Sequence, residues 1–345
     1  MCGICGIWNK NSKPVCKDTL RKMCEVMYHR GPDDKGFLID GSTGLGMRRL
    51  SIIDLTSGNQ PIHNEDESVW VILNGEIYNY QQLTLDLQKR GHTFYTRSDT
   101  EVIVHLYEDY GEECVQYLRG MFAFALWDKN LRKLILARDR VGIKPLFFYE
   151  DGEVLLFGSE IKTILQHNRP SKDLDLYSLD SFFTFLYIPA PKTIFKKISK
   201  LLPGHILIAK DGEITVKKYW DLKYCIDRTK SVFEFTEAFI EKFRESVRLR
   251  LVSDVPLGAL LSGGIDSSAV VAVMSEYSNR PVETFTIGYG KRESTFDETK
   301  YARLVAQIYG TNHHELIVEP NIVDLIPKVC LLYTSDAADE LDGVD

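Results

Sequence analysis

The side chains best suited to chemistry begin at the N-terminus, where the chain reads Met1-Cys2-Gly3. Methionine is usually removed before a small residue, which would leave Cys2 as the terminal residue. The α-amine of Cys2, with a pKa of about 8, would then take the thiol proton directly or through a water. The stretch therefore predicts a terminal cysteine nucleophile. The alternative is a strand that happens to start with cysteine.

A second stretch, residues 255–274, has the order of a buried strand, a tight turn and a helix start. Between its two apolar runs it reads Ser262-Gly263-Gly264-Ile265-Asp266-Ser267-Ser268. Glycines let backbone N–H groups approach an oxyanion, the helix N-terminus adds a favourable dipole, and the serine hydroxyls donate further hydrogen bonds. The pattern predicts a phosphate-binding loop. An ordinary glycine-rich turn is the alternative.

This loop lacks the lysine of a P-loop, since no G-x-x-x-x-G-K-S/T sequence occurs in the chain. Transfer of a γ-phosphoryl group is therefore disfavoured. Asp266 is instead placed to help hold Mg²⁺ on a leaving pyrophosphate.

The composition limits the class of protein. A chain of 345 residues suggests about two domains. Its net charge of −7 comes without a basic block, so nucleic acid is not an expected partner. No apolar run approaches the roughly 20 residues that span a bilayer, and the N-terminus does not read as a signal peptide. Seven scattered cysteines favour a reducing cytoplasm. The eight histidines show no metal-ligand spacing.

Further motifs follow Met1-Cys2-Gly3-Ile4 in the first 160 residues. They read His29-Arg30-Gly31-Pro32-Asp33, Arg49-Leu50-Ser51-Ile52-Ile53-Asp54, Asn74-Gly75-Glu76-Ile77-Tyr78-Asn79 and Ser98-Asp99-Thr100-Glu101. In this order they resemble the class II glutamine amidotransferases, and within them the asparagine synthetases. Chance agreement of the whole set is very improbable.

The resemblance implies a role for each residue type. Cys2 would attack the side-chain amide of glutamine, and Asn74 with the backbone N–H of Gly75 would stabilise the oxyanion. Arg49 would bind the substrate α-carboxylate through two parallel hydrogen bonds, while Glu76 and Asp99 would pair with the α-ammonium. Without that context, Asn74-Gly75 is also a common hairpin turn and Asp99 a helix N-cap.

The second stretch resembles the S-G-G-I-D-S-S signature of ATP pyrophosphatases, which adenylate a carboxylate. The resemblance implies ATP as a substrate and Mg²⁺ as its cofactor, with Asp266 the expected magnesium ligand. The implied nucleotide and pyrophosphate contacts are Leu260, Ser262, Gly263, Gly264, Asp266, Ser267, Ser268, Ile287 and Gly288.

The expected fold is α/β overall. Strands at 122–128, 133–138, 146–149 and 154–158, with helices at 18–30, 80–90 and 100–110, fit two sheets between helices. The resemblance implies an N-terminal-nucleophile αββα sandwich followed by part of a doubly wound parallel-sheet domain. We expect a glutaminase domain over 1–210 and a partial ATP-pyrophosphatase domain over 211–329. The charged motifs at 138–146 and 158–162 are expected to face the second domain.

The end of the chain departs from the family pattern. The run 330–340 resembles a translated transposon-type sequencing adapter, so 330–345 is expected to be a non-native, disordered tail. The family's second glycine-acid motif and the helices that cover the parallel sheet are expected beyond 329 and are not present. We therefore expect glutaminase activity at most, with apolar surface exposed on the second domain.

The parent activity implied by the resemblance is asparagine synthesis. Glutamine is hydrolysed, ammonia passes through an internal channel, and aspartate activated by ATP is amidated to give asparagine, AMP and pyrophosphate. Glutamine, aspartate and ATP are the expected partners, and a homodimer stays open. Two alternatives remain: a member of the family that amidates another carboxylate, and a non-catalytic regulatory protein that keeps the fold.

Overall fold

This computed structural model describes residues 1–289, 297–318 and 325–326. The chain divides into two compact units after Leu222, and each is described here by itself. The predicted boundary at 210/211 falls inside a hairpin formed by β11 (His205–Lys210) and β12 (Glu213–Lys218). This hairpin lies in the first unit because β11 pairs with β7 (Lys133–Arg138).

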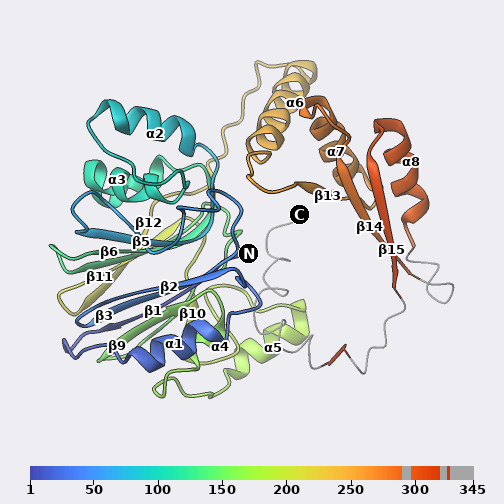
Figure 1. Cartoon of the computed structure of the whole chain (residues 1–345). Helices are drawn as coiled ribbons and strands as arrows, with labels where there is room; N and C mark the ends of the chain where they lie inside the picture. The colour runs from blue at the N-terminus through green and yellow to red at the C-terminus, as the bar shows by residue number, and fades with distance from the viewer. Residues whose placement is uncertain (290–296, 319–324, 327–345) are drawn as a thin grey trace. The chain divides into compact units, whose positions relative to one another are not determined.

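Two antiparallel sheets form the centre of the first unit (Figure 1). One has the order β10-β8-β9-β1-β3-β2 and the other the order β12-β11-β7-β6-β5-β4. The strands of the first sheet are β1 (Gly3–Asn9), β2 (Asp34–Asp40), β3 (Thr43–Arg49), β8 (Phe147–Glu150), β9 (Val154–Gly158) and β10 (Ile198–Lys200). The remaining strands of the second are β4 (Ile62–His63), β5 (Val69–Ile77) and β6 (Gly120–Asp128).

Helices cover the outer faces of both sheets, so the layers are αββα as predicted (Figure 1). The helices of this unit are α1 (Lys17–Glu25), α2 (Tyr80–Lys89), α3 (Glu101–Tyr110), the 3₁₀ helix η1 (Gly111–Gln116), α4 (Ile161–Ile164) and α5 (Leu176–Phe185). The predicted helix 18–30 is too long. The chain leaves the α-helix at Glu25 and reaches Arg30 through turns closed by bonds between residues three apart.

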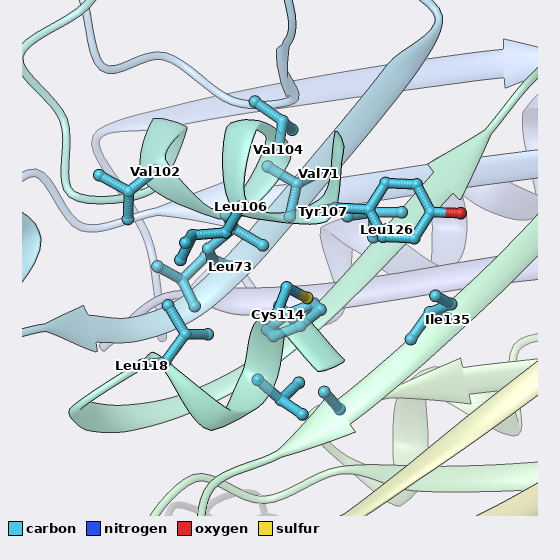
Figure 2. Packing of buried hydrophobic residues seen from close by; sticks show 14 of the residues in the cluster. Val71, Leu73, Val102, Val104, Leu106, Tyr107, Cys114, Leu118, Leu126 and Ile135 are labelled. Carbon is cyan, nitrogen blue, oxygen red and sulfur yellow. The ribbon is translucent and has the colours of Figure 1, made fainter. Parts of the chain in front are cut away.

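Alternating side chains along the strands build three cores within this unit. Between the sheets, Ile4 and Met47 pack with Ile72 and Trp127. Figure 2 shows the core between α3 and its sheet, where Val102 and Leu106 lie over Val71 and Leu73. The third core joins α1 and α4 to the first sheet through Leu20, Met23 and Ile164. The alternation places Val71 and Leu73 toward the helices, and Ile72 and Asn74 toward the other sheet.

The second unit holds a parallel sheet of three strands in the order β13-β14-β15, as the strand–helix alternation predicted. Its described elements are α6 (Val232–Leu249), β13 (Gly258–Leu260), α7 (Ile265–Tyr277), β14 (Glu283–Tyr289), α8 (Thr299–Tyr309) and β15 (Asn312–Val318). The predicted capping box is present, with Ser231 and Glu234 exchanging hydrogen bonds at the start of α6.

The two faces of this sheet differ. On one face Ala259 packs with Val271, Ala302 and Ala306 of α7 and α8. On the other face Leu260, Phe285 and Ile287 are 79%, 43% and 53% exposed. Apolar surface is thus exposed on the second unit, as expected from the sequence.

Candidate active site

A pocket in the first unit collects the residues predicted to handle glutamine. It lies where β1 and β3 approach β5 and the loop before α3, and the predicted residues on its wall are Cys2, Arg49, Asn74, Gly75, Glu76 and Asp99. These residues are far apart in sequence, and the pairing of β1 with β3 and the stacking of the two sheets bring them together.

Cys2 stands just before β1, with its thiol in the pocket. The backbone N–H of Leu50 donates to the Cys2 Sγ at 3.4 Å. Burial raises the pKa of the Cys2 thiol, and the Leu50 hydrogen bond offsets only part of that rise. The thiol is therefore protonated at neutral pH, and a nucleophilic role requires a base beside it.

Asn74 and Gly75 lie inside β5, opposite Ala123 and Phe122 of β6. The hairpin-turn alternative is therefore wrong. Asn74 is fully buried, and neither atom of its side-chain amide has a hydrogen-bond partner among the described residues. A buried, unpaired amide on a pocket wall costs stability, and it is the kind of preorganised donor that a developing oxyanion requires.

Arg49 is buried at the end of β3. Its guanidinium donates to the Asn59 Oδ1 at 2.7 Å and to the carbonyl oxygens of Ile53 and Asp54 at 3.0 and 2.6 Å. These bonds fix the plane of the guanidinium where it lines the pocket. A fixed cation of this shape suits a carboxylate ligand.

Asp99 is not the N-cap of α3, because that position belongs to Thr100. The Asp99 carboxylate instead accepts a hydrogen bond from the Ile77 N–H at 2.8 Å. Burial raises the pKa of Asp99 to about 7, and the nearby charge of Glu76 adds to the rise while the Ile77 bond opposes it. Two carboxylates on one wall of a buried pocket attract a cation such as an ammonium group.

The predicted phosphate loop joins β13 to α7 in the second unit. Gly263 has φ of +84°, and a Cβ there would lie 2.5 Å from the backbone carbon of Tyr301, so only glycine fits. Ser262 Oγ and Ser267 Oγ are 3.0 Å apart, and the Ser262 Oγ also accepts from the Gly264 N–H at 3.2 Å. Asp266 is exposed in the first turn of α7.

The remaining predicted residues lie around this loop. In a parallel sheet the carboxyl ends of neighbouring strands meet at one edge. Leu260 ends β13 and is paired with Phe285, so Ile287 and Gly288 extend beyond it along β14. Ser268 Oγ is buried without a hydrogen-bond partner among the described residues. The loop, the start of α7 and the end of β14 thus belong to one edge of the sheet.

Comparison with known proteins agrees with both halves of the chain. A family model described as "Glutamine amidotransferase domain" matches residues 1–220, and one described as "Asparagine synthase" matches residues 238–342. Asparagine synthetase (glutamine-hydrolyzing) 1 of Bacillus subtilis is 37% identical over 347 residues, which cover 98% of this chain and 54% of that protein. A Methanocaldococcus jannaschii protein whose name includes asparagine synthetase (glutamine-hydrolyzing) 2 is 36% identical over 98% of this chain and 69% of its own length.

The chain belongs to the glutamine-hydrolysing asparagine synthetase family. It spans about half the length of most of the curated relatives that it matches. Another relative, amidase chry2 of Gibberella zeae, is 36% identical over 89% of this chain and 48% of its own length. The predicted non-native tail, 330–345, lies outside the described residues, and the second family match runs into it, to residue 342.

Within the first unit, several charged residues of the motifs at 138–146 and 158–162 are buried. Asp139 is fully buried and accepts hydrogen bonds from the backbone N–H groups of the turn 141–144. Glu160 is also fully buried, at 3.1 Å from Arg30, whose Nε donates to the Cys2 carbonyl oxygen at 2.9 Å. These buried charges are satisfied by backbone groups and by each other inside the fold, and whether the two motifs face the second domain stays a prediction.

Several pocket residues of this family member were not singled out from the sequence. They are Met1, Leu50, Ile52, Ile53, Gln60, Ser98, Thr100, Met121 and Lys144. Gln60 accepts from the Leu73 N–H at 2.6 Å and donates to the Thr100 Oγ1 at 3.1 Å, which ties β5 to α3. Lys144 is buried and was hidden in a motif assigned to another surface. Leu50 lies within the quoted Arg49–Asp54 motif. Its contact with the Cys2 Sγ is made by the backbone N–H, so the residue type could not have predicted it.

We expect Gly75→Ala to destabilise the first unit. Gly75 has φ of +153°, and an added Cβ would lie 2.1 Å from the Met121 carbonyl oxygen. Forcing β5 from β6 should lower the free energy of unfolding by about 2–3 kcal/mol and the melting temperature by about 4–12 °C. Differential scanning calorimetry measures this. Gly152→Ala is the control, because nothing lies within 4 Å of its added Cβ; equal melting temperatures would contradict the prediction.

Proposed function

We propose that the first unit hydrolyses glutamine to glutamate and ammonia, with Cys2 as the nucleophile. The observation that carries the proposal is the convergence of Cys2, Arg49, Asn74, Gly75 and Asp99 on one pocket. The test is direct: the purified protein, with its N-terminal methionine removed, is incubated with glutamine and the glutamate and ammonia formed are measured. A protein with an intact fold and no turnover of glutamine would refute the proposal.

The chemistry begins with the Cys2 thiol. Because the pKa of the Cys2 thiol is raised, the thiol needs a base to become a thiolate. After removal of Met1, the free α-amine of Cys2 is that base and accepts the thiol proton. The thiolate attacks the side-chain carbonyl carbon of glutamine, and the negative charge that forms on oxygen is stabilised by the Asn74 amide and the Gly75 N–H. The tetrahedral intermediate then collapses to a thioester. The leaving ammonia takes its proton from the α-ammonium of Cys2. Water then hydrolyses the thioester to glutamate.

Two further groups hold the amino-acid end of glutamine. The Arg49 guanidinium, fixed by Asn59 and the loop carbonyls, binds the α-carboxylate. Asp99 and Glu76 pair with the α-ammonium from the same pocket. Recognition at both charged groups selects an α-amino acid, and the distance from them to Cys2 selects the length of its side chain.

We expect glutamine binding to strengthen as pH rises to about 7. Asp99 must lose its proton to pair with the ammonium, and its pKa is raised to about 7. Affinity should rise up to about tenfold per pH unit below 7 and level off above it. Calorimetric titration of the inactive Cys2→Ala variant with glutamine measures binding without turnover. The Asp99→Asn variant, made in the same Cys2→Ala background, should bind glutamine weakly at every pH, and its affinity should no longer depend on pH.

The raised pKa of Asp99 also makes the stability of the fold depend on pH. Because the pKa of Asp99 in the folded protein lies above its usual value, the protonated side chain stabilises the fold at low pH, and that contribution is lost as pH rises from about 4 to 7.

An affinity for glutamine that stays constant from pH 5 to 8 would show that Asp99 does not pair with the ammonium group of glutamine.

The second unit is proposed to bind ATP at the loop between β13 and α7 and to take part in amidating an activated carboxylate. Its match to the asparagine synthase family model supports this. The N-terminus of α7 and the Ser262 and Ser267 hydroxyls fit phosphate oxygens. Exposed Asp266 at the start of α7 fits a magnesium ligand, since a hard carboxylate oxygen is what Mg²⁺ prefers. Bound Mg²⁺ would neutralise charge on the pyrophosphate.

Aspartate is the proposed acceptor, with asparagine, AMP and pyrophosphate as products. The names of the B. subtilis and M. jannaschii relatives support it. A second candidate, in which the acceptor is another carboxylate, stays open because a relative of similar identity, from G. zeae, is named an amidase and not an asparagine synthetase. Aspartate-dependent exchange of labelled pyrophosphate into ATP separates the two. Exchange with aspartate supports asparagine synthesis, and exchange with only another carboxylate supports the second candidate.

The setting of the protein is a proposal as well. No helix in the part of the chain that the structure describes is long and apolar enough to cross a membrane. Cysteines 2, 5, 16, 24, 114 and 225 are all free thiols, which supports the predicted reducing cytoplasm. The homodimer stays a prediction, for which light scattering is the measurement.

A further inference from the structure

A cluster of two histidines and two glutamates lies in the first unit. Glu65 follows β4, His92 follows α2, and His105 and Glu108 stand one turn apart on α3. One ligand atom from each side chain lies within 4.8 Å of all the others. None of these four residues lines the glutamine pocket. The sequence showed no metal-ligand spacing among the histidines, and this pair comes together only in the fold.

The distances match those of a small tetrahedral ion. The His92 Nδ1 lies 3.5 Å from both Glu65 Oε1 and Glu108 Oε2. The His105 Nδ1 lies 3.4 Å from Glu65 Oε2 and 3.0 Å from Glu108 Oε2. A tetrahedral zinc ion with bonds of about 2.0–2.2 Å holds its ligand atoms about 3.3–3.6 Å apart. The four ligand atoms as a set lie within 4.8 Å of one another, so the side chains would draw together by up to about 1 Å to bind one ion.

Three of the four contacts are too long for good hydrogen bonds between the groups themselves. Both imidazoles direct the Nδ1 atom toward the glutamates, and their ring centroids are 4.9 Å apart. With neutral imidazoles the set carries a formal charge of −2 from Glu65 and Glu108. A divalent cation would neutralise that charge, and two imidazoles with two carboxylates favour zinc over the calcium or magnesium that all-oxygen sites prefer.

A second layer of contacts orients these side chains. His92 Nε2 lies 3.2 Å from Asp109 Oδ1, within hydrogen-bond distance, and fully buried His105 has its Nε2 near Glu101 Oε1, at 3.5 Å, without a hydrogen bond. A carboxylate behind the second nitrogen of a histidine is the usual support of a zinc ligand. The glutamates are also held: Glu108 Oε1 accepts from Asn64 Nδ2, and Glu65 Oε1 from the Thr93 N–H, each at 2.8 Å.

The cluster can be reached from solvent. The side chains of Glu65 and Glu108 are 37% and 29% exposed, and that of His92 is 13% exposed, while His105 forms the buried floor. An ion therefore has an entry path, and four protein ligands leave no open position for substrate. Closed four-ligand sites are structural rather than catalytic.

We propose that Glu65, His92, His105 and Glu108 bind one Zn²⁺, which fastens the segment 92–100 to α3 and to the residues after β4. This segment ends at Asp99 and Thr100 on the wall of the glutamine pocket. Glu101 already holds its middle, accepting from the backbone N–H groups of Tyr95 and Thr96 at 2.8 and 2.7 Å. The ion would hold the start of the same segment through His92. The site stands whether or not the pocket hydrolyses glutamine.

The first test is metal content. The protein is produced without a polyhistidine tag in zinc-supplemented medium, dialysed against buffer without chelator, and analysed by inductively coupled plasma mass spectrometry. One zinc per chain is expected, and the same value is expected for Cys2→Ala, because Cys2 lies outside the cluster. Absence of zinc, together with no heat of binding when zinc is titrated into the chelator-treated protein, overturns the proposal.

The second test uses the two ligands at the surface, because His105 is buried and its replacement endangers folding. Glu65→Gln and His92→Gln should each weaken zinc binding by more than about 100-fold, and Asp109→Asn by about 10–100-fold. Glu113→Gln is the matched control, since Glu113 is exposed and outside the cluster. Equal zinc affinity in all four variants overturns the proposal.

A third readout follows stability. Zinc at about 100 times its dissociation constant should raise the melting temperature of the protein by about 5–10 °C, and should not do so for His92→Gln. Cobalt in place of zinc should give the intense visible absorption of a tetrahedral site. Weak octahedral absorption with no rise in melting temperature contradicts a four-ligand zinc site.

Discussion

Cys2→Ala should abolish glutamine hydrolysis, with ammonia release reduced by at least about 10⁴-fold. Among the described cysteines, Cys2 alone lines the glutamine pocket. No neighbouring group can replace a nucleophile that forms the thioester. Release of ammonia from glutamine, coupled to glutamate dehydrogenase, measures the loss.

The controls separate chemistry from binding. Cys16→Ala removes an exposed thiol and should leave turnover unchanged. Cys2→Ala should still bind glutamine, because Arg49 and Asp99 are intact. Residual turnover above about 1% of the native rate in Cys2→Ala would falsify the assignment of the nucleophile.

Asn74→Ala should lower kcat for glutamine by about 10²–10³-fold, the usual cost of removing one oxyanion donor. KM should change little, because the amide acts on charge that exists only in the transition state. Steady-state kinetics of ammonia release provides both constants.

A second measurement makes this prediction sharper. The amide of Asn74 is buried without a partner among the described residues, so its removal should leave the melting temperature unchanged or higher. A loss of activity that comes with stability intact is the mark of a catalytic donor. A fall in melting temperature with unchanged kcat would assign Asn74 a structural role instead.

The sequence was sufficient where local pattern and residue chemistry agree. Alternation placed β7 at residues 133–138, and the family resemblance assigned Cys2, Arg49 and Asp99 to one substrate site, where the structure gives them a common pocket. Such positions can be predicted because a single short motif indicates both the secondary structure and the functional side chain on it.

The errors have physical causes as well. Asn74-Gly75 has the composition of a turn, yet pairing with β6 on one side keeps it inside a strand. The burial of Asp139 was not predicted, because residue type does not reveal that its carboxylate accepts from the N–H groups of its own turn. His92 and His105 meet only because the chain turns back between α2 and α3, and spacing rules describe ligands on one element.

In the part of the chain that the structure describes, one face of the three-stranded sheet is exposed, and this affects how the protein behaves during purification. Leu260, Phe285 and Ile287 project from that face, on neighbouring strands about 4.8 Å apart, and form a continuous apolar patch. Sulfate and phosphate are excluded from protein surfaces and strengthen apolar association. The protein should therefore salt out early in an ammonium sulfate cut and bind tightly to phenyl resins, and low-salt buffers should keep it dispersed.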